Sequence, residues 1–291
     1  MNILHQNSRL NSVSLYAFIT MMIVVFTACK KNETIKSENN KIASKDTIAP
    51  SAPKFIVTYT SDTLQDENAL KAFKEKYTLE QQKIIAATNR IDLNRIRIKS
   101  ALVIPDTMLQ SFMDYTPFPA GIEKLINTSK FILVNQRIQL FALYESGKLI
   151  RTGPVSSGRK SKPTPNGLFH TNFKARKKIS TIDGSWVMPY YFNIINRDGV
   201  ALHQFTLPGY PASHSCIRMY EEDAKFIYNW ADQWQLSADG NTVVNKGTPV
   251  LLFGTYDFDG IASWKMLPQD ANAVALTKDE LAVLNETIEM L

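Results

Sequence analysis

The chain of 291 residues carries a formal net charge of +6, with 44% apolar and 10% aromatic residues. This apolar content is enough for a buried core and excludes a chain that is disordered throughout. The length favours one larger domain accompanied by a smaller module. The moderate positive charge suits an anionic polymer, a membrane surface or nucleic acid equally well.

Residues 1–29 contain the parts of an export signal. Arg9 supplies a short positive region, and residues 13–26 form an apolar run that is shorter than the roughly 20 residues of a membrane span. Residues 26–29, Phe-Thr-Ala-Cys, resemble a bacterial lipobox, with phenylalanine where leucine is usual. This resemblance implies a lipid on Cys29 and a membrane anchor. The alternative is an uncleaved N-terminal anchor in which the cysteine is incidental.

Residues 30–51 are rich in Lys, Asn, Glu, Ser and Thr and contain no aromatic residue. Such a segment cannot bury enough apolar surface to fold, so we expect a flexible tether. The protein is then expected in the cell envelope, lipid-anchored to a bacterial membrane and facing the periplasm. The outer membrane is favoured, because Lys30 is not the aspartate of inner-membrane retention. Export argues against nucleic acid as a partner, and we expect a monomer.

Residues 52–126 are predicted to form a small, mainly helical module. Apolar residues recur at helical spacing over 66–77, and a second helix is predicted over 79–91. The segment 85–105 is similar to the second half of a LysM glycan-binding repeat. A helical spacer without a binding role is the alternative.

From residue 131 the pattern changes to short β-prone runs at 131–134, 139–144 and 149–156, with hairpin turns at 135–136 and 146–147.

Two helices are predicted further along the chain. The first covers residues 221–234, where an acidic first turn favours the helix dipole. The second begins at a capping box over 277–280 and runs to Leu291, with an apolar face that includes Leu284. We assign the tail 257–291 a packing role.

Chemistry-bearing residues are concentrated between His203 and Tyr220. A cysteine attacks a carbonyl as thiolate and needs a nearby base or positive charge, which His203 and His214 could supply to Cys216. The alternative is a buried structural cysteine beside core histidines. A disulfide between Cys29 and Cys216 is the default for an exported chain, but we expect none because each thiol has a separate use.

A metal site built from the same two histidines and Cys216 lacks a second ligand pair at zinc-site spacing. We therefore expect no metal and no other cofactor. His170 is expected to be structural. The cluster Lys174, Arg176, Lys177 and Lys178 is either a solvated segment or a surface that steers anionic substrates.

Residues 213–219, Ser-His-Ser-Cys-Ile-Arg-Met, follow a histidine that ends an apolar strand. They resemble the active-site signature of the YkuD-type L,D-transpeptidases, which reads His, a variable loop, then Ser/Thr-His-Gly-Cys, an aliphatic residue and Arg or Asn. Ser215 stands where that family has glycine. If the position requires a positive φ, serine is strained there by roughly 1–2 kcal/mol.

The resemblance extends to the turn 156–158, the loop 163–169, the strands 188–191 and 199–203, and the closing strand 247–253. It implies a mainly β catalytic domain over 127–256, a YkuD-like β-sandwich with a helix after the cysteine, preceded by the small helical module.

The resemblance also implies a function, formation of peptidoglycan cross-links by L,D-transpeptidation. Cys216 would attack the carbonyl of the third residue of a stem peptide, and an amine of a second stem would then take the acyl group. His203 is the expected base, and His214 would orient the site. Ser213, Ser215 and Arg218 would line the oxyanion or substrate site. Carbapenems acylate the cysteine of this family.

Three other functions stay open on the sequence. With water as acceptor the same site would be an L,D-carboxypeptidase, and with a protein lysine it would be a protein-to-peptidoglycan ligase. A non-catalytic, wall-binding lipoprotein is the alternative of another class, in which Ser215 would mark a decayed site.

Overall fold

The structure is a computed structural model that describes residues 57–291. The predicted signal with Cys29 and the predicted tether lie outside the described residues. None of the helices in residues 57–291 combines the length and the apolar composition that crossing a bilayer would need.

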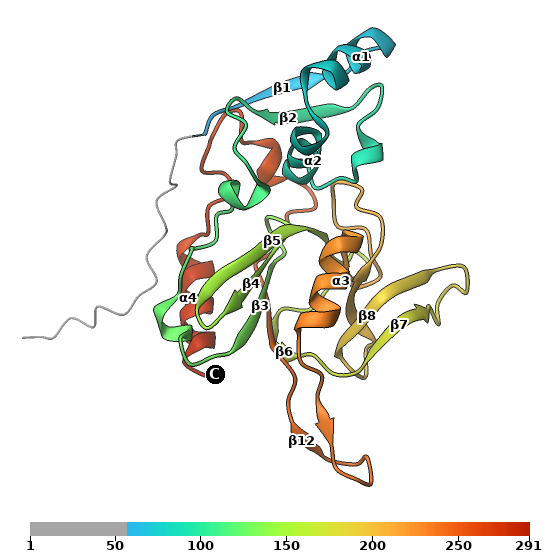
Figure 1. Cartoon of the computed structure of the whole chain (residues 1–291), viewed down its shortest axis with the longest axis vertical. Coiled ribbons are helices and arrows are strands. Elements are labelled where there is room, and N and C mark those ends of the chain that lie inside the picture. The colour runs from blue at the N-terminus through green and yellow to red at the C-terminus, as the bar shows by residue number, and fades with distance from the viewer. Residues whose placement is uncertain (1–56) are drawn as a thin grey trace, which may run out of the picture. The chain divides into compact units, whose positions relative to one another are not determined.

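The N-terminal part of the described chain pairs two helices with two strands (Figure 1, top). The order is β1 (Tyr59–Thr63), α1 (Glu67–Lys76), α2 (Leu79–Thr88) and β2 (Ala101–Pro105), with β1 antiparallel to β2. Thr78 begins α2 with a capping box, in which its hydroxyl accepts from the Gln81 N–H and the Gln81 side chain accepts from the Thr78 N–H. Both predicted helices are present, and the strand pair is an addition that the sequence analysis did not foresee.

Short 3₁₀ helices connect this part to the rest of the chain, at Leu93–Arg95, Phe112–Tyr115 and Glu123–Leu125.

A nine-stranded sheet dominates the remainder, which is mainly β as expected. Its strands are β3 (Lys130–Asn135), β4 (Leu140–Glu145), β5 (Lys148–Ser156), β6 (Gly167–His170), β7 (Lys174–Ile179), β8 (Val187–Ile195), β9 (Val200–Gln204), β10 (Ile217–Met219) and β13 (Pro249–Phe253). They lie in the order β6-β13-β3-β4-β5-β10-β9-β8-β7. The three β-prone runs of the sequence are β3, β4 and β5, each within one residue of its predicted ends.

Both faces of this sheet are buried, which explains the nearly continuous apolar runs in its central strands. In β3, Phe131 and Leu133 face one core, and Ile132 and Val134 face the other. The first core is covered by α4 (Lys278–Ile288) and the second by α3 (Glu221–Trp230), on opposite sides of β3–β5 (Figure 1).

The helix after the cysteine, α3, ends at Trp230 and not at the predicted residue 234. The residues that follow use their backbone donors elsewhere. The Asp232 N–H donates to Thr248 Oγ1, and the Trp234 N–H donates to the Asn172 carbonyl. These tertiary bonds replace further helical turns.

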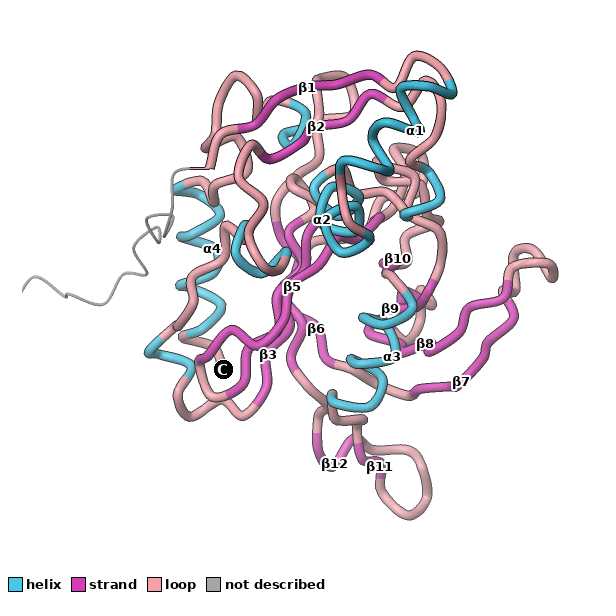
Figure 2. Tube along the Cα trace, turned by 45° about the horizontal axis from the view of Figure 1, so that its top comes forward, coloured by secondary structure: helices cyan, strands magenta, loops and turns pink. Residues whose placement is uncertain are grey.

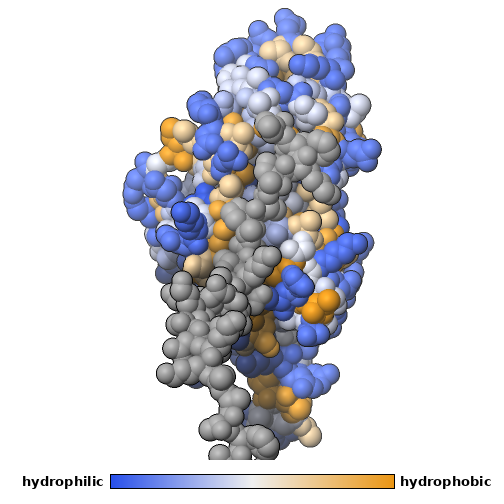
Figure 3. Space-filling view, turned by 90° about the vertical axis from the view of Figure 1, so that its left-hand side faces the viewer, coloured by the Kyte–Doolittle hydropathy of each residue, from blue (hydrophilic) through white to orange (hydrophobic). Residues whose placement is uncertain are grey.

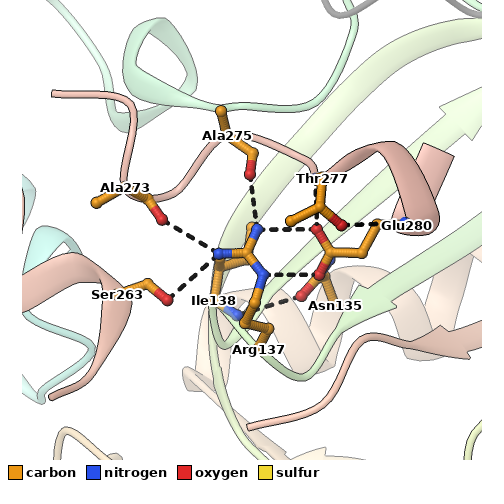
Figure 4. A network of polar contacts seen from close by, with 8 residues as sticks. All are labelled: Asn135, Arg137, Ile138, Ser263, Ala273, Ala275, Thr277 and Glu280. Atoms are coloured by element: carbon orange, nitrogen blue, oxygen red, sulfur yellow. Dashed lines mark hydrogen bonds and ion pairs between the residues drawn. The ribbon is translucent and has the colours of Figure 1, made fainter. Parts of the chain in front are cut away.

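The C-terminal tail is held to the sheet by a polar network around Arg137 (Figure 4). The guanidinium donates to both carboxylate oxygens of Glu280, at 2.9 and 2.8 Å, and to the carbonyls of Ala273 and Ala275. Thr277 caps α4 through the predicted box with Glu280. A short 3₁₀ helix, η4 (Ser263–Lys265), precedes this clasp and buries Trp264. These contacts explain how the C-terminal tail packs against the sheet.

A small hairpin of β11 (Gln235–Leu236) and β12 (Val243–Asn245) projects away from the sheet (Figure 1, bottom). It carries the exposed side chains Leu236, Val243 and Val244. On the face shown in Figure 3, hydrophilic side chains predominate and apolar ones occur in scattered groups.

Candidate active site

Two neighbouring parallel strands, β9 and β10, position the predicted catalytic residues (Figure 2). His203 lies on β9, directly opposite Arg218 of β10. Cys216 comes immediately before β10, at the end of the loop that returns from β9. A separation of thirteen positions in sequence is thereby reduced to adjacent strands, and both side chains line one pocket of about 230 Å³.

His203 is almost fully buried and is fixed by its own strand. Its Nδ1 lies 2.9 Å from the Gln204 carbonyl oxygen. Since a carbonyl only accepts, Nδ1 carries the proton and Nε2 is left as an acceptor. Aromatic rings of Tyr191 and Phe205 flank the imidazole. Burial lowers the pKa of His203 to about 4, so the ring is neutral near pH 7.

Cys216 is half-buried, and its thiol is also neutral in the resting site. Burial raises the pKa of Cys216, while a backbone hydrogen bond from Ala201 and the charge of Arg218 act in the opposite direction. The sulfur lies 3.6 Å from the Gly199 carbonyl oxygen. The pair is thus a neutral thiol with a neutral imidazole, and proton transfer has to accompany nucleophilic attack.

His214 has a different environment. Its Nε2 lies 2.6 Å from Nη2 of Arg159, and its ring packs 4.7 Å from the Trp186 ring. A guanidinium only donates, so Nε2 accepts and Nδ1 bears the proton. That Nδ1 is buried, and no residue within 57–291 lies in hydrogen-bond reach of it. His214 also lines the pocket of Cys216.

The residue between His214 and Cys216 adopts the conformation in which glycine would be unstrained. Ser215 has φ +81°, a left-handed value that costs a non-glycine residue about 1 kcal/mol. The turn is held by Thr164, whose hydroxyl donates to the Ser215 carbonyl at 2.8 Å. The Ser215 hydroxyl donates to the Lys162 carbonyl at 3.2 Å. These bonds keep the strained backbone in place.

Ser213 stabilises the turn that contains Ser215 and Cys216. Its side chain donates to the Cys216 carbonyl, and its backbone pairs with Ser157 and Arg159. The hydroxyl is buried and hydrogen-bonded, and Ser213 lines the same pocket as Cys216 and His203.

Two cations and one carboxylate also line the pocket: Arg218, Lys178 and Asp198. The Arg218 guanidinium lies over the Phe205 ring, 4.6 Å from its centroid. Lys178 comes from β7, the edge strand, and lies 5.1 Å from the centroids of Phe173 and Tyr191. The β7–β8 hairpin forms one wall of the site, with Trp186 near its tip.

The sequence alone does not identify some of these residues as part of the site. In the sequence, Lys178 is one member of a basic cluster with Lys174, Arg176 and Lys177. The alternation of β7 separates it, because Lys177 is exposed and points to the other face. Arg159 and Trp186 carried no local signal, since only the parallel bridge between Gly158 and Ser213 and the hairpin fold bring them to His214. His170 lies on β6, away from the lining of this pocket.

No group of three or more His, Cys, Asp or Glu side chains in residues 57–291 is placed to hold a metal ion.

Comparisons with known proteins relate part of this chain to one family. Residues 129–252 match the family model of the YkuD L,D-transpeptidase catalytic domain. L,D-transpeptidase 1 of Mycobacterium tuberculosis (strain ATCC 25618 / H37Rv) is 28% identical over 104 residues, which are 31% of this chain and 41% of that protein. The chain therefore spans less than half the length of this curated relative.

Two solved structures give weaker similarities. An L,D-transpeptidase from Stackebrandtia nassauensis is 23% identical with a TM-score of 0.36, covering 44% of this chain and 57% of that one. The L,D-transpeptidase of Xylanimonas cellulosilytica DSM 15894 (residues 123–326) is 21% identical with a TM-score of 0.42, covering 70% and 100%. By this sequence match, residues 129–252 are similar to the L,D-transpeptidase catalytic domains of the YkuD family.

Proposed function

We propose that the protein is a peptidoglycan L,D-transpeptidase that works through a thioester on Cys216. The observation that carries the proposal is the shared pocket of Cys216 and His203, in which the hydrogen bond of Nδ1 to Gln204 leaves Nε2 as the free acceptor. A thiol with a positioned neutral base is the arrangement that acyl transfer requires.

In the first half-reaction, the Cys216 sulfur attacks the carbonyl carbon of the third stem residue as its proton passes to His203 Nε2. The C–N bond to the terminal D-alanine then breaks, and the departing amine takes that proton from His203. The products are free D-alanine and a thioester. The neutral resting state agrees with this order, since burial disfavours a thiolate–imidazolium pair before substrate arrives.

In the second half-reaction, a side-chain amine of another stem attacks the thioester carbonyl. An amide forms, the C–S bond breaks, and the amine's proton returns to sulfur through His203. The tetrahedral oxyanion of each step needs preorganised donors. We assign these to the backbone N–H groups of Ser215 and Cys216 and to Nδ1–H of His214, whose only ring acceptor is occupied by Arg159.

The charges of the pocket suit a substrate with carboxylates. Stem peptides of the proposed kind carry a carboxylate on the terminal D-alanine, and a second one on the third residue where that residue is the diamino dicarboxylic acid diaminopimelate. Lys178 and Arg218 are the cations that line the pocket, and no ion pair within residues 57–291 engages either of them. Both are therefore available to a substrate carboxylate.

The test is mass spectrometry of muropeptides released from sacculi after incubation with the protein. The expected result is cross-links between third-position residues, absent with Cys216→Ala and retained with His170→Gln. Tripeptides without cross-links would identify a carboxypeptidase. Unchanged sacculi, with Cys216 shown to be a free thiol, would contradict the proposed reaction.

We also infer that the chain is exported and lipidated on Cys29, because the short apolar run 13–26 is followed by Thr27, Ala28 and Cys29 in a lipobox-like order. The anchor would hold the enzyme beside the wall, with residues 30–51 as spacer. Mass analysis of the mature N-terminus should find an acylated Cys29, and Cys29→Ser should abolish acylation. An unmodified N-terminus at another residue would contradict this inference.

A further inference from the structure

A second pocket, of about 290 Å³, lies away from Cys216, between the N-terminal part and the active-site loop. One wall is the segment from Arg95 to Leu102, which connects α2 to β2. Lys265 of η4 supplies another wall, and Pro208 and Gly209 close it from the loop that joins His203 to Cys216. Three distant parts of the chain therefore meet there.

The lining of this pocket is strongly basic. It contains Arg95, Arg97, Lys99 and Lys265, and no aspartate or glutamate. Arg95 has a long contact of 3.7 Å with Asp92. The other three cations take part in no ion pair within residues 57–291. Lys99 is held with φ +69°, a conformation that costs a lysine free energy.

A buried cation, Arg90, is close enough to Lys265 of the pocket lining for its charge to act on it. Arg90 is 2% exposed, and within residues 57–291 its guanidinium forms no ion pair: it donates to neutral carbonyls, those of Ile138, Ala87 and Thr88, and lies over the Trp264 ring. The Lys265 ammonium likewise donates to Asn89 Oδ1 at 3.0 Å and to the Ala101 carbonyl at 2.9 Å. Burial lowers the pKa of both side chains, and the charge of Arg90 lowers that of Lys265 further.

Buried cations normally have a counter-charge, because desolvating an unpaired one is costly. Here the buried Arg90 acts on the half-buried Lys265, and the open pocket next to Lys265 is lined by three more cations. An anion in the pocket would supply the missing charge. An ammonium group has three N–H donors. Lys265 uses two of them in hydrogen bonds to protein acceptors, so one remains for a ligand.

We propose that this pocket binds a phosphate group, through Arg97, Lys99 and Lys265 with Arg95 at its edge. Phosphate fits better than a carboxylate because it carries up to two charges and three or four acceptor oxygens against four cations. The phosphate could belong to a soluble phosphorylated molecule, as a monoester, or to a phospholipid headgroup, as a diester with a single charge, and both present anionic phosphate oxygens to these cations.

A phosphate bound in this pocket would contact the loop that joins His203 to Cys216, because Pro208 and Gly209 of that loop line the pocket. Ile91 and Pro208 form an antiparallel bridge. Asp92 accepts from the Leu207 N–H and donates its own N–H to the Leu207 carbonyl. A phosphate bound next to Gly209 would stabilise these contacts between residues 91–92 and residues 207–208. The site stands independently of the proposed reaction, because none of its residues lines the Cys216 pocket.

The first test is calorimetric titration of the full chain with inorganic phosphate. The wild type should bind saturably, and the double variant Arg97→Gln/Lys99→Asn should bind roughly tenfold more weakly or worse. Asparagine is chosen at position 99 because it tolerates a left-handed backbone. The control Lys71→Gln/Lys74→Gln removes the same charge from the exposed face of α1 and should bind like wild type. Absence of saturable binding, or equal weakening in both doubles, would overturn the proposal.

Hydrogen exchange then locates the site. Phosphate should slow exchange in peptides that cover residues 95–101 and 207–210, and slowing confined to other segments would overturn the assignment. Glycerophosphate and vesicles of phosphatidylglycerol with phosphatidylcholine identify the source. Vesicle binding that depends on Arg97 and Lys99 indicates a headgroup, and binding of glycerophosphate alone indicates a soluble ligand. If neither probe depends on these residues, the proposal fails.

Discussion

Arg159 Nη2 lies 2.6 Å from Nε2 of His214, so a permanent cation occupies the only acceptor of that imidazole. The ring is thereby fixed as a neutral group with its proton on Nδ1, and it cannot act as a base without breaking this contact. The two histidines of this pocket thus carry the proton on the same nitrogen, Nδ1, but differ in which nitrogen is engaged: Nδ1 of His203 is hydrogen-bonded and its acceptor Nε2 is free, whereas Nε2 of His214 is engaged and its donor Nδ1 has no partner within residues 57–291.

Removing the cation should release His214. Burial and the charges of Arg159, Arg218 and Lys162 lower the pKa of His214, so Arg159→Gln should raise it, and the ring should become protonated at a higher pH. NMR titration of the imidazole measures this shift. Lys160→Gln is the matched control, because Lys160 pairs with Asp259 and not with the site. Equal shifts in both variants would contradict a direct contact.

Lys178 should contribute to substrate binding. Lys178→Met removes a cation from the pocket while keeping a long apolar stem over Phe173 and Tyr191. The KM for a stem tetrapeptide should rise roughly tenfold with little change in kcat, since a charge-assisted contact is lost in both ground and transition states. Lys177→Met, one position along the same strand but exposed, should leave both parameters unchanged. A fall in kcat alone would show that Lys178 acts on the chemical step.

Ser215→Gly should stabilise the fold. Relief of the left-handed backbone is worth roughly 1–2 kcal/mol. The added freedom of glycine in the unfolded chain and the loss of the exposed contact to the Lys162 carbonyl offset only part of it. The free energy of unfolding from urea titration should therefore rise. Ser129→Gly, at an exposed position that is not among the positive-φ residues, should lower it. A drop with Ser215→Gly would mean that the hydroxyl matters more than the strain.

The parts of this fold that could be predicted are those in which local pattern and tertiary packing agree. The apolar residues of β3 and the capping box at Thr277 are needed by the strand and the helix in which they occur. Each can therefore be recognised from a few neighbouring residues. That His203 and Cys216 lie near one another could be predicted, because a single loop connects them in the sequence. β1 could not be foreseen, since its residues are mostly exposed and only the pairing with β2 makes it a strand.

Contacts between distant segments could not be read from the chain. Arg159 meets His214 across 55 positions, and Lys178 enters the pocket only because β7 pairs with β8 at the sheet edge. The effect of burial on charge was also not readable from the chain. Desolvation raises the pKa of Cys216 and lowers that of His203, so it favours the neutral form of both groups.

The clasp of the C-terminal tail should be worth several kcal/mol. Burial alone would raise the pKa of Glu280, but hydrogen bonds from Arg137, Thr277 and Asn135 hold it below its ordinary value. Arg137→Met leaves this carboxylate buried and unpaired, so the free energy of unfolding should fall by ~3 kcal/mol. Because the folded pKa is depressed, the stabilisation exists above the ordinary pKa of glutamate and is lost as pH falls, so the variant's deficit should shrink in acid.

Lys124→Met is the control for this clasp, since its ion pair with Glu289 is exposed and should contribute under about 1 kcal/mol. Urea titrations of both variants at neutral and acidic pH make the comparison. Equal losses for the two substitutions would mean that the Arg137 network adds nothing beyond a surface ion pair.

The base should be identifiable from the pH dependence of Cys216 acylation by a carbapenem, followed by intact mass. With His203 as base, the wild-type rate should stay nearly level above pH 5 and fall as pH drops through about 4, where His203 becomes protonated. His203→Ala should slow acylation at pH 7 by roughly 100-fold or more. Its remaining rate should rise about tenfold per pH unit, because attack then depends on the small thiolate fraction of a thiol with a raised pKa.

His214→Ala provides the contrast within the same pocket. It removes an oxyanion donor and leaves the base, so the rate should fall while the level pH profile persists. A steep thiolate-type profile in His214→Ala, together with a level one in His203→Ala, would show that the two histidines have exchanged roles. In that case the hydrogen bond between His203 and Gln204 would be structural, and the contact of Arg159 would have to open before each turnover.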